Sequence, residues 1–231
     1  MKGLLYAGCV LNKKFFITAG IAGTAATILA VIGVLNVDTN RFFKEIAYFL
    51  FLIAAGLPGC IALEFPARDL EKNIKSRFAN YALAGGISKN QFVLAELLKN
   101  LLCVIGGVLF CGMVGLILMA VNPGYIVARS LVLPMLIIVL MGAMEWAVMP
   151  LTISFKSAEK AGLTLGLFIG FGICLPASTF FANELRGGSS SNILSLLVEP
   201  WLPWATLGFA VVVYAVVYVI LLARVKRGDV C

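Results

Sequence analysis

Six long apolar runs divide this chain, and no other feature constrains its fold as strongly. The runs extend over residues 15–37, 46–63, 101–121, 131–151, 161–182 and 202–223, and Glu145 is the one acidic or basic residue within them. A helix needs about 20 apolar residues to cross the hydrocarbon core of a bilayer, where its backbone N–H and C=O groups must satisfy one another. The pattern therefore predicts an all-α polytopic membrane protein, with six transmembrane helices in one domain over residues 1–231.

The basic residues indicate how these helices are oriented. Lys and Arg are retained preferentially on the cytoplasmic side of a membrane. The N-terminus, the second and fourth loops and the C-terminus hold 14 of the 18 Lys and Arg residues, and the other three loops hold 4. Both termini are therefore predicted to be cytoplasmic, and the net charge of +7 favours contact with anionic lipid headgroups. No basic stripe is interleaved with aromatic residues, so nucleic acid is not an expected partner.

The residues that common enzyme chemistry requires are absent from the sequence. There is no histidine, which excludes Ser-His-Asp hydrolysis and nearly all usual zinc sites. No G-x-x-x-x-G-K-[ST] motif occurs, so the chain is not expected to hydrolyse ATP itself. None of the six cysteines stands in C-x-x-C spacing. We therefore expect no enzyme activity, no cofactor and no metal.

Glu145 is the exception among the apolar runs. A carboxylate inside a membrane is costly and must face protein or water, so a functional site is its default interpretation. It lies toward the cytoplasmic third of its run, where the cost is lower. Two interpretations stay open: a structural hydrogen bond, and a role in substrate passage or conformational coupling.

Residues 1–14 form a short amphipathic pattern before the first run. Leu4, Leu5 and Val10 fall near one helical face, and lysines stand toward both ends of the segment. The pattern predicts a helix that lies in the membrane interface. A frayed tail is the alternative.

Small residues recur every four positions in three of the runs, as close approach of helices in a membrane requires. The three ridges are Ala19, Gly23 and Thr27; Gly107, Cys111 and Gly115; and Gly162, Gly166 and Gly170. We favour packing of these ridges inside the bundle over contact with a second subunit. Kinks or breaks are predicted at the prolines of the runs, Pro58, Pro134, Pro150 and Pro176.

A polar segment, residues 69–92, lies between the second and third runs on the predicted cytoplasmic side. Apolar residues at every fourth position predict a helix over 69–83, which Gly85–Gly86 should end. Ser88 and Gln91 have the spacing of a capping box and predict a second helix that leads into the third run. The segment should therefore protrude from the membrane as a docking surface.

The residues of this segment follow a recognisable order. An acidic residue and an aromatic are followed by apolar residues at the end of a short helix, and then by Ser, a basic residue and an aromatic that lead into a span. These residues are Asp69, Phe78, Leu83, Ile87, Ser88, Lys89 and Phe92. In this order the chain resembles the ABC-2-type exporter permeases, the small six-span membrane subunits of ATP-binding-cassette transporters. Gly86 stands where that family commonly has proline, and Glu96 where it often has lysine.

The resemblance implies a membrane subunit of an ATP-driven exporter in the bacterial plasma membrane. Its partners would be two cytoplasmic ATPase subunits and a second permease copy or paralogue. Its substrate would be an amphipathic or antimicrobial peptide, such as a phenol-soluble modulin, moved by alternating access. Residues 1–14 would be the elbow helix and residues 69–92 the coupling segment. The implied ATPase-coupling residues are Asn73, Lys75, Arg77, Phe78, Tyr81 and Leu83.

Two other functions stay open at the level of the sequence. A secondary transporter or channel would use Glu145 as its proton or cation site, and such proteins more often show an inverted repeat, which is not visible here. A membrane partner that does not transport, such as an immunity factor that sequesters a peptide, is the other alternative. Dependence of transport on a separate ATPase would distinguish the exporter from both.

Overall fold

The computed structural model describes residues 13–36, 41–123, 131–169 and 201–228. Helices account for nearly all of these residues, and no strand occurs among them. The helices are α2 (Lys13–Leu35), α3 (Arg41–Lys75), α4 (Phe78–Ala84), α5 (Lys89–Val121), α6 (Val132–Phe155), α7 (Ala158–Ile169) and α10 (Leu202–Arg227). The prediction of an all-α chain is therefore confirmed.

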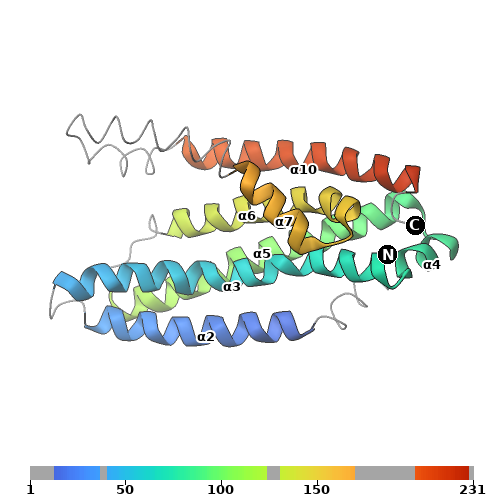
Figure 1. Ribbon diagram of the computed structural model, residues 1–231. Helices are drawn as coiled ribbons and strands as arrows, with labels where there is room; N and C mark the ends of the chain where they lie inside the picture. The colour runs from blue at the N-terminus through green and yellow to red at the C-terminus, as the bar shows by residue number, and fades with distance from the viewer. Residues whose placement is uncertain (1–12, 37–40, 124–130, 170–200, 229–231) are drawn as a thin grey trace.

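The long helices lie side by side in a bundle, in which α2, α3, α5 and α6 alternate in direction and α10 runs parallel to α6 (Figure 1). Helix α3 is central, because it packs against α2, α5 and α6. Helix α10 packs against α6 and α5, and α2 lies on the opposite side of the bundle. Among the described residues, five helices, α2, α3, α5, α6 and α10, are long and apolar enough to cross a membrane. This is the architecture of a polytopic membrane protein.

Most of the predicted spans correspond to described helices. The spans over 15–37, 101–121, 131–151 and 202–223 coincide with α2, the second part of α5, α6 and α10. The span over 161–182 is described only as far as Ile169, as α7, so six spans stay a prediction. The elbow helix over 1–14 lies outside the described residues up to residue 12, and Lys13 and Lys14 begin α2 instead.

Helix α3 extends beyond the predicted second span, 46–63, at both ends. Helix α3 begins at Arg41 and continues without interruption through Pro58 and Pro66 to Lys75. Both prolines are buried, and a Cβ placed at Gly23 of α2 would lie 2.8 Å from the Pro58 ring. A neighbouring helix thus packs closely against α3 at this point, and such packing lets a membrane helix tolerate proline. Helix α6 likewise continues past Pro150.

The prediction of a single helix over 69–83 is wrong, because two helices share this stretch. Helix α3 ends at Lys75 and α4 begins at Phe78. Between them Arg77 takes a left-handed backbone conformation with φ of 57°. That conformation is unfavourable for a residue with a Cβ, and it turns the chain out of the axis of α3.

The turn from α4 into α5 confirms the predicted end and start signals. Gly86 has φ of 92°, and the N–H of Ile87 donates to the carbonyl of Ala82 at 3.2 Å. Ser88 and Gln91 form the capping box, since each side chain accepts a hydrogen bond from the other's backbone N–H. Helix α5 therefore begins at a position that the sequence determines locally.

The glycine ridges of the first and third runs pack inside the bundle, as favoured. A Cβ at Gly23 would lie 2.7 Å from the Phe110 ring, and one at Gly107 would lie 3.0 Å from Ile138. The ridge in α7 differs, because nothing lies within 4 Å of a Cβ placed at Gly162 or Gly166. Packing of that ridge inside the bundle is therefore not found for these two residues, and Gly170 lies outside the described residues.

One end of the bundle holds the start of α2, the connection from α3 to α5, the turn from α6 to α7 and the end of α10 (Figure 1). Lys89 Nζ donates to the carbonyl of Lys226 at 3.0 Å and ties α5 to α10 there. We call this the basic end, because its helix ends carry Lys13, Lys14, Lys75, Arg77, Lys89, Lys156, Arg224, Lys226 and Arg227. It is the end that the sequence predicts to be cytoplasmic.

Candidate functional site

A buried ionic cluster joins α3 to α5 near the basic end. Lys99 Nζ of α5 lies 2.5 Å from Asp69 Oδ2 of α3 and 2.8 Å from Glu96 Oε1 of its own helix. Asp69 and Lys99 are 2% exposed and Glu96 is 0% exposed. Buried charges are tolerated only when they are paired with good geometry. The Asp69–Glu96–Lys99 cluster therefore fixes how α3 sits against α5.

A second polar link extends from this cluster to α10 and α6. Tyr214 of α10 donates from its hydroxyl to Asn100 Oδ1, one turn after Glu96 on α5, at 2.5 Å. Trp146 Nε1 of α6 donates to the carbonyl of Tyr214 at 3.2 Å, and the two rings stack with centroids 6.1 Å apart. Polar contacts therefore connect α3, α5, α10 and α6 at one level of the bundle.

Two buried atoms at this level have no hydrogen-bond partner among the described residues. They are Glu96 Oε2 and Asn100 Nδ2. Asp69 differs from Glu96, because its Oδ2 also accepts from Asn73 Nδ2 at 3.3 Å. The two carboxylates that share Lys99 are therefore unequally satisfied.

The sequence contains a signal for this cluster. Glu96, Lys99 and Asn100 are spaced three and four residues apart, so they share one face of a helix that continues into an apolar run. Lys99 was counted only as a cytoplasmic charge, and Glu96 only as a departure from the resembling family. A polar face on such a helix predicts polar partners on neighbouring helices, although it does not identify them.

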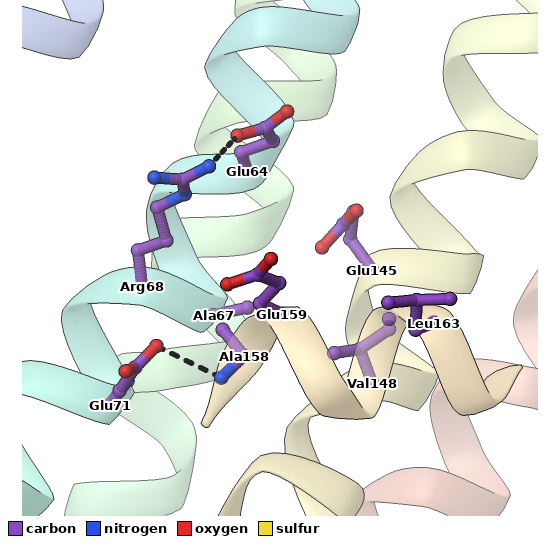
Figure 2. Close-up of a pocket in the computed structure, with 10 residues that line it drawn as sticks. Glu64, Ala67, Arg68, Glu71, Glu145, Val148, Ala158, Glu159 and Leu163 are labelled. Carbon is purple, nitrogen blue, oxygen red and sulfur yellow. Dashed lines mark hydrogen bonds and ion pairs between the residues drawn. The ribbon is translucent and has the colours of Figure 1, made fainter. Parts of the chain in front are cut away.

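An acidic cavity lies between α3, α6 and α7 (Figure 2). Its volume is about 370 Å³, and four glutamates and one arginine line it together with small and apolar residues. Arg68 pairs with Glu64 at 2.8 Å, and Glu71 Oε2 accepts from the N–H of Ala158 at 2.9 Å, which holds the start of α7 against α3. The lining residues are Glu64, Ala67, Arg68, Glu71, Glu145, Val148, Ala158, Glu159, Gly162 and Leu163.

Glu145, the intramembrane carboxylate, lies in this cavity. No hydrogen bond or ion pair from another described residue reaches its side chain, and the same holds for Glu159. The interpretation of Glu145 as a structural hydrogen bond thus finds no partner in the described part of the chain. Because carboxylates outnumber the single guanidinium, the cavity suits a cationic group.

The predicted coupling residues lie together at the basic end, although they occupy two helices. Asn73 and Lys75 are in the last turn of α3, and Lys75 pairs with Glu71 at 2.5 Å. Arg77 and Phe78 stand at the break, where the Phe78 side chain is 40% exposed. Leu83 of α4 packs against the apolar cluster around Leu70, Phe92 and Trp146, and Tyr81 also lies in α4.

The two polar sites and the predicted coupling residues thus include neighbouring parts of α3. Helix α3 is common to all of them, because it carries Asp69, the cavity residues between Glu64 and Glu71, and two of the predicted coupling residues, Asn73 and Lys75. Within the described residues, no group of three or more His, Cys, Asp or Glu side chains could hold a metal ion. Comparisons with known protein families, with curated proteins and with solved structures find no match to this chain.

Proposed function

We propose that this chain is the membrane-spanning subunit of an ATP-driven exporter, moved by separate ATPase subunits that bind the connection from α3 to α5. The single observation that supports this most is the continuity of α3. It extends from the apolar interior to Lys75 without a break, and the chain then turns at Arg77 into α4. A rigid helix can carry a displacement of its end into the bundle.

The surface of this connection suits a protein partner. Phe78 exposes an aromatic ring at an end of the molecule that is otherwise rich in lysine and arginine. Aromatic and arginine side chains are the residue types most enriched at the energetic centre of protein interfaces. We therefore assign Arg77 and Phe78 as the central ATPase contact, with Asn73, Lys75, Tyr81 and Leu83 around it.

A second copy or a paralogue of the chain would complete the exporter. The open ridge at Gly162 and Gly166 is a surface on which another membrane helix can approach closely, since nothing in the described structure lies over it. The proposed cargo is an amphipathic peptide, and the acidic cavity would attract its basic groups. The proposed location is a bacterial plasma membrane with both termini in the cytoplasm.

Purification of the chain from its native host tests the proposal. We expect a P-loop ATPase in the complex, lost or strongly depleted in Phe78→Asp and in Arg77→Glu. Phe155→Asp is the matched control, because Phe155 is 45% exposed and ends α6 at the same end of the molecule. Equal loss in Phe155→Asp, or no ATPase in the wild-type complex, would contradict the proposal.

The acidic cavity supports one other candidate, a secondary transporter that uses Glu145 as its ion site. Its carboxylate has no hydrogen-bond or ion-pair partner among the described residues, and it faces a cavity shared with Glu64 and Glu159 (Figure 2). An ionisable residue in that position is a functional candidate by default. Transport in proteoliposomes that follows a proton gradient without any ATPase, and that disappears in Glu145→Gln, would favour this candidate over the exporter.

A further inference from the structure

The Asp69–Glu96–Lys99 cluster contains two carboxyl groups and one ammonium group. If all three were ionised, the cluster would carry one net negative charge in a place where Asp69 and Lys99 are 2% exposed and Glu96 is 0% exposed. An uncompensated charge is much more costly in such a place than a neutral group. When two carboxyl groups share one buried site, one of them keeps its proton readily.

The hydrogen bonds indicate which carboxyl group carries that proton. Asp69 Oδ2 accepts from both Lys99 Nζ, at 2.5 Å, and Asn73 Nδ2, at 3.3 Å. Glu96 accepts only from Lys99, on Oε1 at 2.8 Å, and no described residue bonds to its Oε2. Donors stabilise the ionised form of a carboxyl group, so the better supplied Asp69 is the one that stays ionised.

We propose that Glu96 is a proton-binding site of this protein. The proton is taken from water and forms an O–H bond at Oε2, while Oε1 still accepts from Lys99. The cluster is then neutral, with Asp69 as the carboxylate and Lys99 as the ammonium. This site is distinct from Glu145, and it is independent of whether an ATPase drives the protein.

Among the described residues, the surroundings of Glu96 add no other compensating charge. Asp69 from α3 and Lys99 from α5 are the charged groups that act on it. The Tyr214 hydroxyl of α10 donates to Asn100, and Trp146 of α6 donates to the Tyr214 carbonyl, so both of these neighbours are neutral. Exposed Lys72 lies further along α3, the charged residue of α6, Glu145, lines the acidic cavity, and Lys13 and Lys14 of α2 are exposed.

The proposal has a conformational consequence. The proton is held because Asp69 and Glu96 share one ammonium group inside a buried junction between α3 and α5. If α3 moves away and water enters, Glu96 becomes the sole carboxyl partner of Lys99 and ionises. Separation of the two helices at this level would therefore release one proton.

Infrared spectroscopy of the purified full-length chain in lipid nanodiscs tests the proposal. We expect a carbonyl band of a protonated carboxylic acid near neutral pH, and ¹³C labelling of the glutamate carboxyl groups should shift it. Glu96→Gln, which is isosteric, should remove this component. Glu145→Gln is the control and should leave it in place.

Asp69→Asn adds an independent check. Glu96 would then be the only carboxyl partner of Lys99, so it should ionise and the same component should disappear. A wild-type band that is absent or does not shift with labelled glutamate overturns the proposal without any variant. The proposal is also overturned if Glu96→Gln removes nothing, or if the component persists in folded Asp69→Asn protein.

Discussion

Two faces of α3 each carry an ion pair, but one pair is buried and the other is exposed. On one face Asp69 pairs with Lys99, and their side chains are only 2% and 1% exposed. On the other face Glu64 pairs with Arg68, and their side chains are 49% and 55% exposed beside the acidic cavity. The first pair fixes α3 to α5, whereas the second leaves a carboxylate-rich space open between helices. Both pairs combine an acidic and a basic side chain, so it is burial that makes the first a structural contact and exposure that makes the second part of a candidate binding site.

The difference should be large in energy. Removing one partner of a buried ion pair typically costs about 3–5 kcal/mol, because it leaves a buried charge uncompensated. An exposed pair contributes about 0–1 kcal/mol, because water already solvates both groups. Substitutions on the two faces of α3 should therefore differ in their effect on stability.

The largest effect is expected for Lys99→Met. This change removes the ammonium group that Asp69 and Glu96 share, and the free energy of unfolding should fall by about 3–5 kcal/mol. Arg68→Met is the matched change on the other face and should cost less than about 1 kcal/mol. Denaturant unfolding of both purified variants in detergent gives the two values, and similar losses would remove the distinction between the faces.

The next effect concerns the hydrogen bond that extends the buried face to α10. Tyr214→Phe leaves Asn100 Oδ1 buried without its donor, which should cost about 1–3 kcal/mol. Tyr218→Phe is the control on the same helix, because no described residue hydrogen-bonds to the Tyr218 hydroxyl. The same unfolding measurement applies. A loss as large in Tyr218→Phe as in Tyr214→Phe would show that the Asn100 contact is not responsible.

A smaller, local effect is expected on the open face. Glu71→Ala removes the acceptor for the N–H of Ala158, so the start of α7 should open more often, by about 1 kcal/mol. Hydrogen exchange of the peptide around Ala158 should become faster by the factor that corresponds to this change in the free energy of opening. Glu64→Ala, on the same face but without that bond, should leave this exchange unchanged.

The smallest effect is expected at Gly162, which lines the cavity. Nothing lies within 4 Å of a Cβ at this position, so Gly162→Ala should change stability by less than about 1 kcal/mol, in the stabilising direction. Gly107→Ala should instead destabilise by about 1–3 kcal/mol, because its Cβ would lie 3.1 Å from the Cα of Gly59. Thermal unfolding in detergent measures the change in stability of both variants. Both values refer to the monomeric chain, because the proposed second copy would pack on the Gly162 ridge. A marked loss of stability in monomeric Gly162→Ala would contradict the open ridge.

Local signals predicted much of the fold. Apolar runs of sufficient length identified α2, α5, α6 and α10, since helices in a membrane must satisfy their own backbone. Ser88, Gln91 and Gly86 predicted the start of α5 correctly, because a capping box and a left-handed glycine act over a few residues. The sequence did not predict that α3 continues without a break through Pro58 and Pro66 to Lys75, because packing against neighbouring helices overrides local preference there.

The sites depended on contacts that no local pattern specifies. The cavity combines residues near 64–71, 145–148 and 158–163, and the ionic cluster joins Asp69 to residues of α5 thirty positions later. Glu145 was recognised because an acid in an apolar run is conspicuous. Asp69 and Lys99 were assigned to a solvated cytoplasmic segment, since the sequence does not reveal that α3 extends far enough to bury them.

In the proposed exporter, a separate ATPase acts on this bundle through the break between α3 and α4. A photo-crosslinking amino acid placed at Phe78 in the native host tests it most directly, with the same residue placed at Phe155 as control. We expect a crosslink from position 78 to a P-loop ATPase, and no ATPase crosslink from position 155. Crosslinks from position 78 that reach only lipid, or an equal yield of ATPase crosslinks from both positions, would contradict it.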